Sequence, residues 1–422
     1  MRGMLMKTMR ELTVQLMFDP GLPLLLEVFN RKINGFAESR WIKLNLHLTP
    51  WEKGWAELMK TALYRWGPDV SEVGTSWVES LVNLQALRPF TSEEVELIRG
   101  NYEFLPASWD TAYIAGDPRV WSIPWMADTR LTYYRLDIFE KADVDPERAF
   151  SSHETFLEAL EKLARAEVEI PLAIPTAPEN PTLHVAASWV WATGGEFMSP
   201  DGQKVLFNEP EAVEGFCRYF DLYRYIAPSI QGMGDAEVNP LFRKGRVAIL
   251  ISGQWVLNSI RSGDAAPEVL ENLGVAPVPG VPFVGGGNLV IWQHARYPDL
   301  AIETVSFLTS LEMQETCFKA LWMLPTRLET LKSDLFEKDE ALRVIRNNLL
   351  RGKAFKGAYM WGIVEDGLCS LIASIWNTLF AKAEAGRVDL RQMVSAELDK
   401  LATAINSALY DRFWKRQAAI AS

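Results

Sequence analysis

The sequence predicts an α/β protein built from two domains, each with strands that alternate with helices. Three observations lead to this prediction. The chain has 422 residues, which is too long for one compact core. Its first part alternates between strand-like and helix-like patterns, as in mostly parallel sheets covered by helices on both faces. A long strand-like run, VWSIPWMADTRLTYYRLDIF at 120–139, carries a proline and an Asp-Thr-Arg triplet that an ordinary central strand avoids.

The amino-terminal domain is expected to open with the apolar strand LTVQLMF, followed by the turn Asp19-Pro20-Gly21. Ligands of such sheets bind beyond the carboxyl ends of the strands, where Asp19, Thr75, Ser76 and Trp77 fall. The other elements expected here are a helix over about 23–38, a strand at 42–48, a helix from 51, a short strand near 70 and a helix after 77.

The second domain is expected to follow the 120–139 strand. Ser151 and Glu154 have the spacing of a capping box, which predicts a helix over about 153–167. Further elements are expected at 171–176 (strand), 182–193 (helix), after 208 (helix), 246–252 (strand), 280–292 (a strand returning to the first domain) and 299–320, 339–350, 364–384 and 389–409 (helices). The prediction is therefore two α/β domains joined by two or three strand crossovers, with a carboxy-terminal helical cluster.

The 120–139 strand is the first candidate for a binding site. We expect it to leave one domain at Pro124 and to enter the other near Asp128, where it would line a wet cleft. An Asp and an Arg are costly inside a sheet unless they are paired or hydrated. Asp128 and Arg130 are therefore candidate ligand contacts, with a simple salt bridge that caps the strand as the alternative.

Composition excludes several classes of function. With 43 basic and 54 acidic side chains, the net charge of −11 does not favour nucleic acid or an anionic membrane as a partner. No apolar run approaches the roughly 18–20 residues that a membrane helix needs. The four isolated histidines and three scattered cysteines predict neither a metal site nor a disulfide framework, and no cofactor is expected. Residues 1–18 lack a signal-peptide pattern, which predicts a cytoplasmic protein or a chain whose export signal has been removed.

Five segments occur in an order that resembles a known family. They are GPDVSEVGTSW, IPWMADTRLTYYRLDIF, WATGG followed by FNEPEA, RKGRVAILISGQW, and GGGNLVIW. Together they resemble the extracellular solute-binding proteins of ABC importers, most closely the carbohydrate-binding, maltose-binding-protein-like branch, over about residues 11–409. The resemblance implies a two-lobe periplasmic-binding-protein-like fold, with lobe I at 1–125 and 283–325 and lobe II at 126–282 and 326–422.

The resemblance also implies a function. A sugar would bind between the lobes of a monomer in the periplasm or at the cell surface, and lobe closure would signal to a membrane permease. The export signal of such a protein is not visible in this chain. His184 is a departure, since it stands where the family often has a stacking aromatic. The positions that match ligand contacts in the family are Asp19, Thr75, Ser76, Trp77, Asp128, Arg130, His184, Gly253, Trp255, Asn288 and Trp361.

These residue types suit a sugar. Asp, Arg and Asn side chains form paired hydrogen bonds with neighbouring hydroxyls, and tryptophan covers the C–H face of a sugar ring. Alternatives stay open: Trp255 could belong to the core, and Trp77 could pack on its own helix. A polyamine or a phosphorylated polyol is the alternative ligand, although the triple glycine at 285–287 lacks the GK[ST] of a phosphate loop. A glycoside hydrolase is the competing enzyme, but no acid and nucleophile pair is recognisable.

Overall fold

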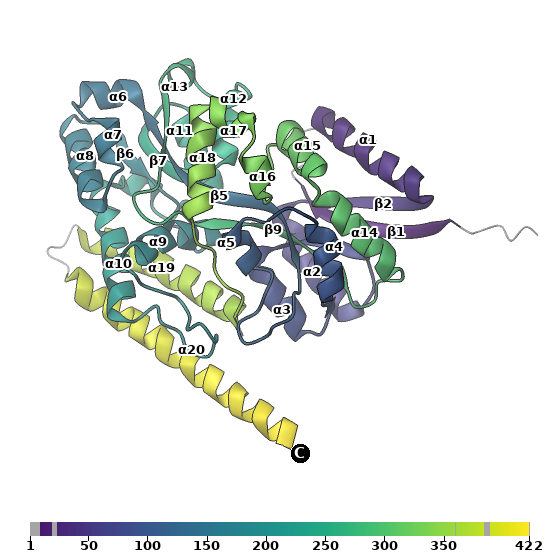
Figure 1. Cartoon of the computed structure of the whole chain (residues 1–422). Helices are drawn as coiled ribbons and strands as arrows, with labels where there is room; N and C mark the ends of the chain where they lie inside the picture. Colours follow the sequence, from purple (N-terminus) through teal and green to yellow (C-terminus); the bar gives the residue numbers. More distant parts are fainter. Residues whose placement is uncertain (1–8, 19–22, 359, 384–388, 422) are drawn as a thin grey trace, which may run out of the picture. The chain divides into compact units, whose positions relative to one another are not determined.

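A computed structural model describes residues 9–18, 23–358, 360–383 and 389–421. The chain divides into two compact units, which are described separately. Unit 1 comprises the chain up to Ala127 together with Gly285–Ser333, and unit 2 comprises Asp128–Val284 together with the chain from Asp334. Figure 1 shows helices around strands in both units, which confirms the predicted α/β class.

Unit 1 is built on a sheet in which β1 (Arg10–Met17) lies between two parallel neighbours, β2 (Ile42–Thr49) and β3 (Val70–Gly74). β9 (Val284–Trp292) runs antiparallel to β3 and continues the sheet to the first part of β5 (Ile123–Arg135). The remaining elements are α1 (Pro23–Arg40), α2 (Trp51–Tyr64), η1 (Thr75–Trp77), α3 (Val78–Asn83), β4 (Leu87–Arg88), α4 (Ser92–Arg99), α5 (Pro106–Asp110), α14 (Pro298–Leu308), α15 (Leu311–Leu321), β10 (Leu324–Pro325) and α16 (Leu328–Leu331).

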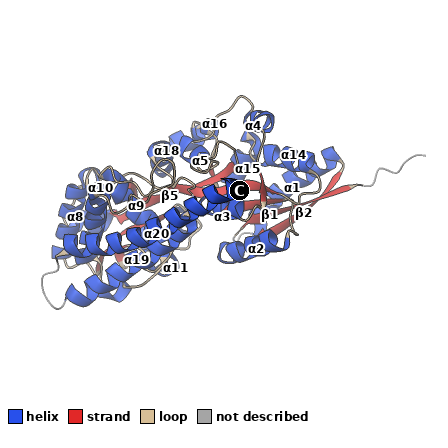
Figure 2. Ribbon diagram, turned by 90° about the horizontal axis from the view of Figure 1, so that it is seen from below, coloured by secondary structure: helices blue, strands red, loops and turns tan. Residues whose placement is uncertain are grey.

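Both faces of this sheet are buried at its centre, because the side chains of β9 alternate between two hydrophobic clusters. On β9, Leu289 and Ile291 join the cluster formed with α1, α14 and α15, whereas Val290 and Trp292 join the cluster formed with α2 and α3. Figure 2 shows α2 on one side of β1 and β2 and α1 and α14 on the other. The sheet is therefore covered by helices on both faces, as the alternating pattern predicted.

A buried arginine joins distant segments of unit 1. Arg327 is 2% exposed, and its guanidinium lies 3.8 Å from the ring centroid of Phe104. It donates hydrogen bonds of 2.6 to 3.1 Å to the carbonyl oxygens of Ile98, Arg99, Tyr102 and Thr309. Burial lowers the pKa of Arg327 to about 10, which still leaves it charged at neutral pH.

In unit 2, the second part of β5 pairs antiparallel with β7 (Val247–Gly253) and β8 (Leu273–Pro277), and β6 (Ile170–Ala173) pairs parallel with β7. The sheets of both units are thus mixed rather than mostly parallel, because β9 runs against β3 in unit 1 and β5 runs against β7 and β8 in unit 2. The other elements are α6 (Leu136–Lys141), α7 (Pro146–Ala149), α8 (His153–Arg165), α9 (Asn180–Ala192), α10 (Pro210–Asp221), η2 (Leu222–Tyr225), η3 (Pro228–Ile230), α11 (Asp235–Arg243), α12 (Trp255–Arg261), α13 (Pro267–Glu271), α17 (Asp334–Lys338), α18 (Glu340–Arg351), α19 (Trp361–Ala383) and α20 (Leu390–Ala421).

Two details of the helices differ from the sequence prediction. α8 begins at His153 as predicted, but its cap is Ser152 rather than Ser151, since the side chain of Ser152 accepts the backbone N–H of Thr155. The expected helix at 299–320 is two helices, because the hydroxyl of Ser310 accepts the N–H of Met313 and starts α15 anew. In both places a hydroxyl side chain that caps free N–H groups decides where the helix begins.

One helix is longer and more apolar than the sequence analysis predicted. Residues Trp361–Lys382 of α19 are long and apolar enough to cross a membrane by length and composition, and 56% of that stretch is buried within the protein. α19 packs against α9 and α20, and Trp376 donates its indole N–H to the hydroxyl of Tyr219 at 3.1 Å. These contacts are typical of a core helix in a soluble protein.

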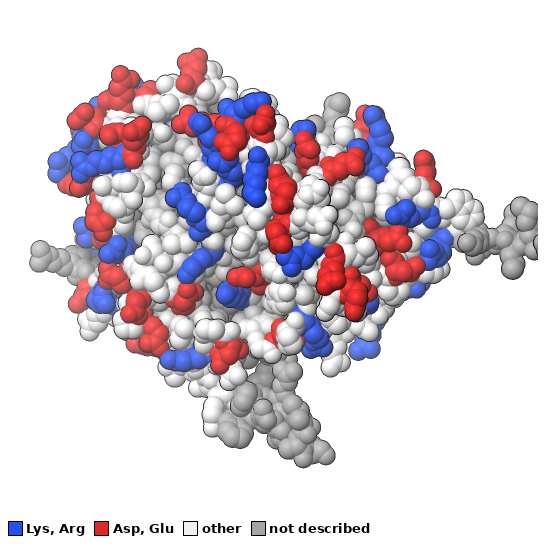
Figure 3. Space-filling model, in the orientation of Figure 1, with Lys and Arg blue, Asp and Glu red and all other residues white. Residues whose placement is uncertain are grey.

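Figure 3 shows acidic and basic side chains interspersed over the visible face, consistent with the excess of acidic residues.

Candidate functional site

Trp255 lies at the carboxyl end of β7, at the start of α12, and is 36% exposed. Its indole ring covers the backbone of Gly253: a Cβ atom added to that glycine would lie 2.1 Å from two ring atoms. The indole N–H donates to Oδ2 of Asp235 at 3.0 Å. The ring is thus held in place at its polar edge while part of its surface stays open. This position, beyond the end of a strand, is where ligands of α/β sheets bind.

Asp235, at the start of α11, organises the polar groups around Trp255. Its Oδ1 accepts the hydroxyl of Ser252 at 2.8 Å, and its Oδ2 also accepts the amide of Asn239 at 3.0 Å. Its backbone N–H donates to Oε1 of Glu179 at 2.6 Å. Burial raises the pKa of Glu179, and the negative charge of Asp235 adds to that rise. The carboxyl group of Asp235 therefore contacts the indole of Trp255, and that of Glu179 lies next to Asp235.

Arg130 lies opposite Gly253 in the β5–β7 ladder and is 2% exposed. Its guanidinium carbon is 4.9 Å from the ring centroid of Trp255 and 5.4 Å from that of Phe283, distances typical of cation–π contacts. Asp128, two residues earlier on the same strand, has Oδ2 at 3.7 Å from Nη1 of Arg130. Burial of this arginine without loss of its charge depends on these neighbours.

His184, on α9, completes the surroundings of Arg130. Its Nδ1 is 2.7 Å from Nη2 of Arg130, and its ring stacks on Phe283 with centroids 3.9 Å apart. Since a guanidinium only donates, Nδ1 must accept, and the neutral ring carries its proton on Nε2. Burial, and then the charge of Arg130, lower the pKa of His184 well below its usual value. The ring is therefore neutral at pH 7.

The structure thus brings together five of the residues predicted from sequence: Asp128, Arg130, His184, Gly253 and Trp255 all lie in one part of unit 2. We call these five residues, with Asp235, Glu179 and Phe283, the Trp255 site. Sequence reasoning missed the last three residues. A Gly-Asp pair that starts a helix, as at Gly234-Asp235, is the signal that could have drawn attention to Asp235.

Thr75, Ser76 and Trp77 lie on unit 1, in the single turn of η1 that follows β3, and all three are partly exposed. The ring of Trp77 packs against Trp51 and Trp55 of α2, with centroids 5.7 and 5.6 Å apart. The tryptophan therefore packs on a helix next to its own, and the turn remains at the end of a strand as predicted. Asp19 lies outside the described residues.

Two of the residues predicted as ligand contacts are buried in this structure. Asn288 is 0% exposed, and its side-chain amide donates to the hydroxyls of Thr111 and Ser122, both at 2.9 Å. Trp361 is 1% exposed, with its ring packed against Phe355 at a centroid distance of 4.7 Å. Both side chains are internal because segments distant in the sequence cover them, and each stabilises the interior of its own unit.

A buried carboxyl group in unit 1 was also missed. Glu72, in the middle of β3, is 0% exposed, and its Oε2 accepts the N–H of Met17 at 2.7 Å. Its Oε1 has no hydrogen-bond partner among the residues that the structure describes. Burial raises the pKa of Glu72 well above its usual value, despite the hydrogen bond from Met17. The group is an internal acid of the sheet rather than part of an exposed site.

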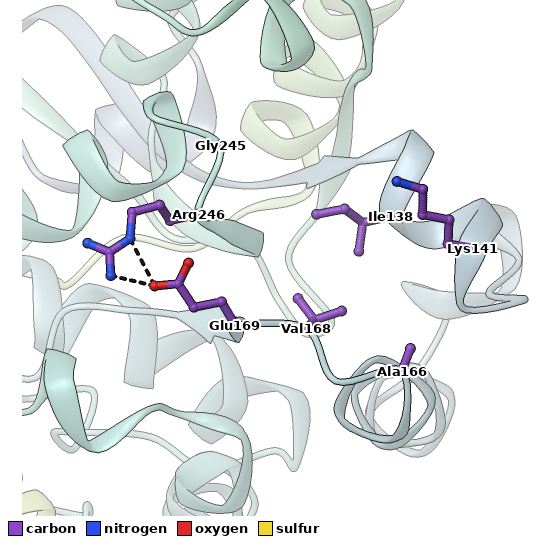
Figure 4. A pocket seen from close by; sticks show the side chains of 7 residues that line it. All are labelled: Ile138, Lys141, Ala166, Val168, Glu169, Gly245 and Arg246. Atoms are coloured by element: carbon purple, nitrogen blue, oxygen red, sulfur yellow. Dashed lines mark hydrogen bonds and ion pairs between the residues drawn. The ribbon is translucent and has the colours of Figure 1, made fainter.

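A pocket of about 220 Å³ lies at the other end of the unit 2 sheet (Figure 4). It is found beside Glu169 and Arg246, which immediately precede β6 and β7, and these two side chains form an ion pair. Ligands of α/β sheets bind at the carboxyl ends of strands, so this pocket is at the unfavourable end. Its lining residues are Ile138, Lys141, Ala166, Val168, Glu169, Gly245 and Arg246.

Within the described ranges, no group of three or more His, Cys, Asp or Glu side chains is arranged to hold a metal ion. The cysteines are buried or partly buried, and burial raises the pKa of Cys217 to about 11 and that of Cys317 to about 12. They are therefore protonated and unreactive at neutral pH. The groups that the Trp255 site presents can stack on a ring, form hydrogen bonds and attract charge.

The chain is similar to known proteins in both sequence and structure. The chain is 22% identical over 306 residues to the diacetylchitobiose binding protein DasA of Streptomyces coelicolor, covering 69% of this chain and 68% of that one. Among solved structures, it resembles the sugar-binding protein MalE of Xanthomonas citri, with a TM-score of 0.79, 19% identity and coverage of 96% and 99% of the two chains.

A solute-binding protein of an ABC transporter from Thermotoga lettingae, bound to α-D-tagatose, gives a TM-score of 0.75 at 21% identity, covering 95% of this chain and all of that one. At such identities the likeness shows the fold, and it confirms the predicted periplasmic-binding-protein-like class. Residues 42–315 match the family described as bacterial extracellular solute-binding protein. The chain therefore belongs to the family of bacterial extracellular solute-binding proteins.

Proposed function

We propose that this protein is the ligand-capturing component of an ABC importer and that it binds a carbohydrate at the Trp255 site. It works as a monomer in the periplasm or at the cell surface and delivers its ligand to a membrane permease. Family membership supports the importer role, and the sugar-binding names of DasA and MalE support the ligand class.

The observation that carries this proposal is the partly exposed indole of Trp255, held by Gly253 beneath it and by Asp235 at its N–H. A pyranose ring offers a face of C–H groups that stacks on such an indole, and a rim of hydroxyls that needs acceptors. Asp128 and Glu179 provide carboxylate oxygens in the same part of unit 2. Hydrogen bonds to such charged groups contribute roughly 1.5–3 kcal/mol each.

Capture rather than catalysis is the better account of these carboxylates. A glycoside hydrolase needs one free acid and one free nucleophile or base on either side of the scissile bond. Both oxygens of Asp235 already accept hydrogen bonds from the protein, and Oε1 of Glu179 accepts the N–H of Asp235. These two carboxyl groups hold the site together and are poorly placed to exchange protons with a substrate.

A polyamine is the second candidate ligand, and one observation favours it. Burial, and then the negative charges of Asp235 and Glu237, raise the pKa of Glu179, so three acidic side chains lie near one another in this region. An ammonium group would relieve that charge. The only cation of the Trp255 site, Arg130, is enclosed by the described residues and already paired with Asp128.

A thermal-shift screen of the purified chain tests the proposal, with maltotriose, N,N′-diacetylchitobiose, D-tagatose, glycerol phosphate and spermidine as probes. A ligand present at 100 times its Kd adds about 2.7 kcal/mol of stability. Stabilisation by a carbohydrate supports the proposal, whereas stabilisation by spermidine alone replaces the carbohydrate with a polyamine. A screen without any shift, together with hydrolysis of an aryl glycoside, would overturn the binding role.

The variant Trp255→Ala tests whether the carbohydrate binds at Trp255. A tryptophan side chain offers up to roughly 250 Å², so the exposed third of this indole presents roughly 90 Å² for stacking. At about 25 cal/mol per Å², its loss costs about 2 kcal/mol, or about a 30-fold increase in Kd. The matched control is Trp66→Ala, since Trp66 is 81% exposed on unit 1, and this variant should bind as the wild type does. Equal affinities for the two variants would remove Trp255 from the site.

A further inference from the structure

We propose that His184 is a positioning residue for the Trp255 site, where its Nδ1 atom anchors the guanidinium of Arg130 against the indole of Trp255. Protonation of this one histidine then controls the shape of the ligand-binding surface. The inference deepens the proposed function and rests on it, because the surface concerned is the one assigned to the carbohydrate.

The contacts form a continuous stack within unit 2. Trp255 lies 4.9 Å from the guanidinium of Arg130, which lies 5.4 Å from the ring of Phe283. Phe283 in turn stacks on His184 with an interplanar angle of 11°. His184 therefore contacts Arg130 twice: directly through Nδ1, and indirectly through the phenylalanine that both residues share. A shift of the histidine must be passed on to the indole through packed groups.

The hydrogen bond from Arg130 to His184 decides the orientation of the guanidinium. Nε and Nη1 of Arg130 have no hydrogen-bond partner in the described part of the chain. The carboxylate of Asp128 attracts Nη1 from 3.7 Å, which is beyond hydrogen-bonding distance. The 2.7 Å contact between Nη2 and Nδ1 is thus the directional bond that holds this buried cation in one orientation.

A proton on Nδ1 would break this arrangement. The atom would lose its lone pair and become a donor, which would place two cations face to face at the distance of the present bond. Arg130 would then have to turn away, and the indole that it supports would follow. Burial and the charge of Arg130 lower the pKa of His184, so the change belongs to acidic pH.

The other charged groups near the pair do not offset this repulsion. Asp128 on β5 already attracts Nη1 of Arg130. On the Trp255 side, Glu179 accepts the backbone N–H of Asp235, and the carboxylate of Asp235 accepts the indole N–H of Trp255. The segment that packs on His184 from after α18 contributes the uncharged ring of Phe355, 6.0 Å away. The neighbouring lysine of that segment, Lys353, is paired with Glu196 at 2.8 Å.

The test monitors the surroundings of the Trp255 indole by fluorine NMR in the ligand-free protein. The protein is labelled with 5-fluorotryptophan, and the Trp255 signal is assigned by its absence in Trp255→Phe. Fluorine spectra are recorded for the wild type, His184→Asn and His184→Phe at a series of pH values, from pH 7.5 down to the onset of acid unfolding as followed by circular dichroism. The asparagine places an uncharged acceptor near the position of Nδ1, whereas the phenylalanine keeps the stacked ring without an acceptor. His294→Asn, a histidine of unit 1 that contacts Pro68, is the matched control.

We expect the Trp255 signal of the wild type and of His294→Asn to move on acidification. In His184→Asn the signal should keep the position that the wild type has at pH 7.5 throughout the series, and in His184→Phe it should be displaced already at pH 7.5. A wild-type signal that ignores pH, or one that moves equally in His184→Asn, would overturn the proposal. If His184→Phe does not fold, the comparison of the wild type with His184→Asn still tests whether His184 positions Trp255.

Affinity provides the second readout, with N,N′-diacetylchitobiose and maltotriose as probes in calorimetry. If only the form with neutral His184 binds, Kd should rise about tenfold for each pH unit below the pKa of His184 in the wild type, and stay level in His184→Asn. Absence of binding for every probe at pH 7.5 would count against the proposed function. The fluorine spectra would still show whether His184 positions Trp255, so the two failures are distinguishable.

Discussion

Gly253→Ala should impair ligand binding by moving a neighbouring side chain rather than by removing a contact. A Cβ at this position would lie 2.1 Å from Cζ3 and Cη2 of Trp255, whereas ordinary carbon contacts begin near 3.4 Å. The indole must therefore move by more than an ångström. β7 cannot yield instead, because every residue of the strand is buried and Gly253 pairs with Arg130 across the sheet.

The size of the effect follows from what the displaced ring loses. Its N–H leaves the carboxylate of Asp235, a charged hydrogen bond that contributes roughly 1.5–3 kcal/mol. Stacking on roughly 90 Å² of open indole contributes about 2 kcal/mol to binding, so its loss should weaken binding by about 30-fold. Overpacking of this kind costs about 1–3 kcal/mol of stability, which a two-unit protein of this size survives.

The assay is calorimetric titration with the carbohydrate that stabilises the wild type, on Gly253→Ala, Trp255→Ala and the double variant. Once the indole is absent, the added methyl group meets nothing, so the glycine substitution should cost no further affinity in the Trp255→Ala background. Gly35→Ala is the matched control, because nothing lies within 4 Å of its Cβ position and the helix should gain slightly in stability. Wild-type affinity of Gly253→Ala, or the same loss in both backgrounds, would refute this reasoning.

Three further predictions concern stability. Because the pKa of Glu72 is raised in the folded state, the free energy of unfolding should fall as the pH rises above about 4.3, the pKa of the unfolded chain. In urea titrations between pH 4.5 and 8, Glu72→Gln should lose this dependence on pH. Equal pH dependence of the wild type and the variant would contradict the assignment of Glu72 as a buried acid. The pKa of His184 is lowered in the folded state, so its contribution to the free energy of unfolding should be complete above about pH 6.5 and decline below that value. Between pH 7.5 and 5.0, the urea midpoint of His184→Asn should fall less than that of the wild type. An equal fall would count against a neutral ring in the folded protein. Arg327→Gln leaves four carbonyl oxygens without their donor and should destabilise unit 1 by about 3 kcal/mol or more, seen as an earlier thermal transition, whereas the exposed Arg31→Gln should change little.

Much of the fold could be predicted from the sequence, because local patterns carry that information. Strands such as Val247–Gly253 are apolar throughout, and helices such as His153–Arg165 show apolar residues every three or four positions. The class of fold follows from how such elements alternate. The relative directions of the strands cannot be predicted in this way, because β5 pairs with β7 and β8, which lie more than 100 residues later in the sequence.

The candidate site was predictable only where its residues follow directly from a strand end. Gly253 and Trp255 end the apolar strand β7, and Asp128 and Arg130 interrupt β5, so both pairs stand out in the sequence. Their roles as ligand contacts remain predictions that the binding experiments test. Asn288 looked equally promising as a polar residue in an apolar strand, and its hydrogen bonds to Thr111 and Ser122 could not be read from that pattern.

The sequence by itself determined the α/β class, the resemblance to solute-binding proteins and the strand ends at which polar and aromatic residues gather. The tertiary structure alone decided which of those residues are exposed and what holds them. His184 meets Arg130 from 54 residues away, and Asp235 holds an indole 20 residues away. Periodicity along a chain reports only which face of an element is apolar, whereas burial, pKa shifts and ring stacking arise from segments brought together by folding.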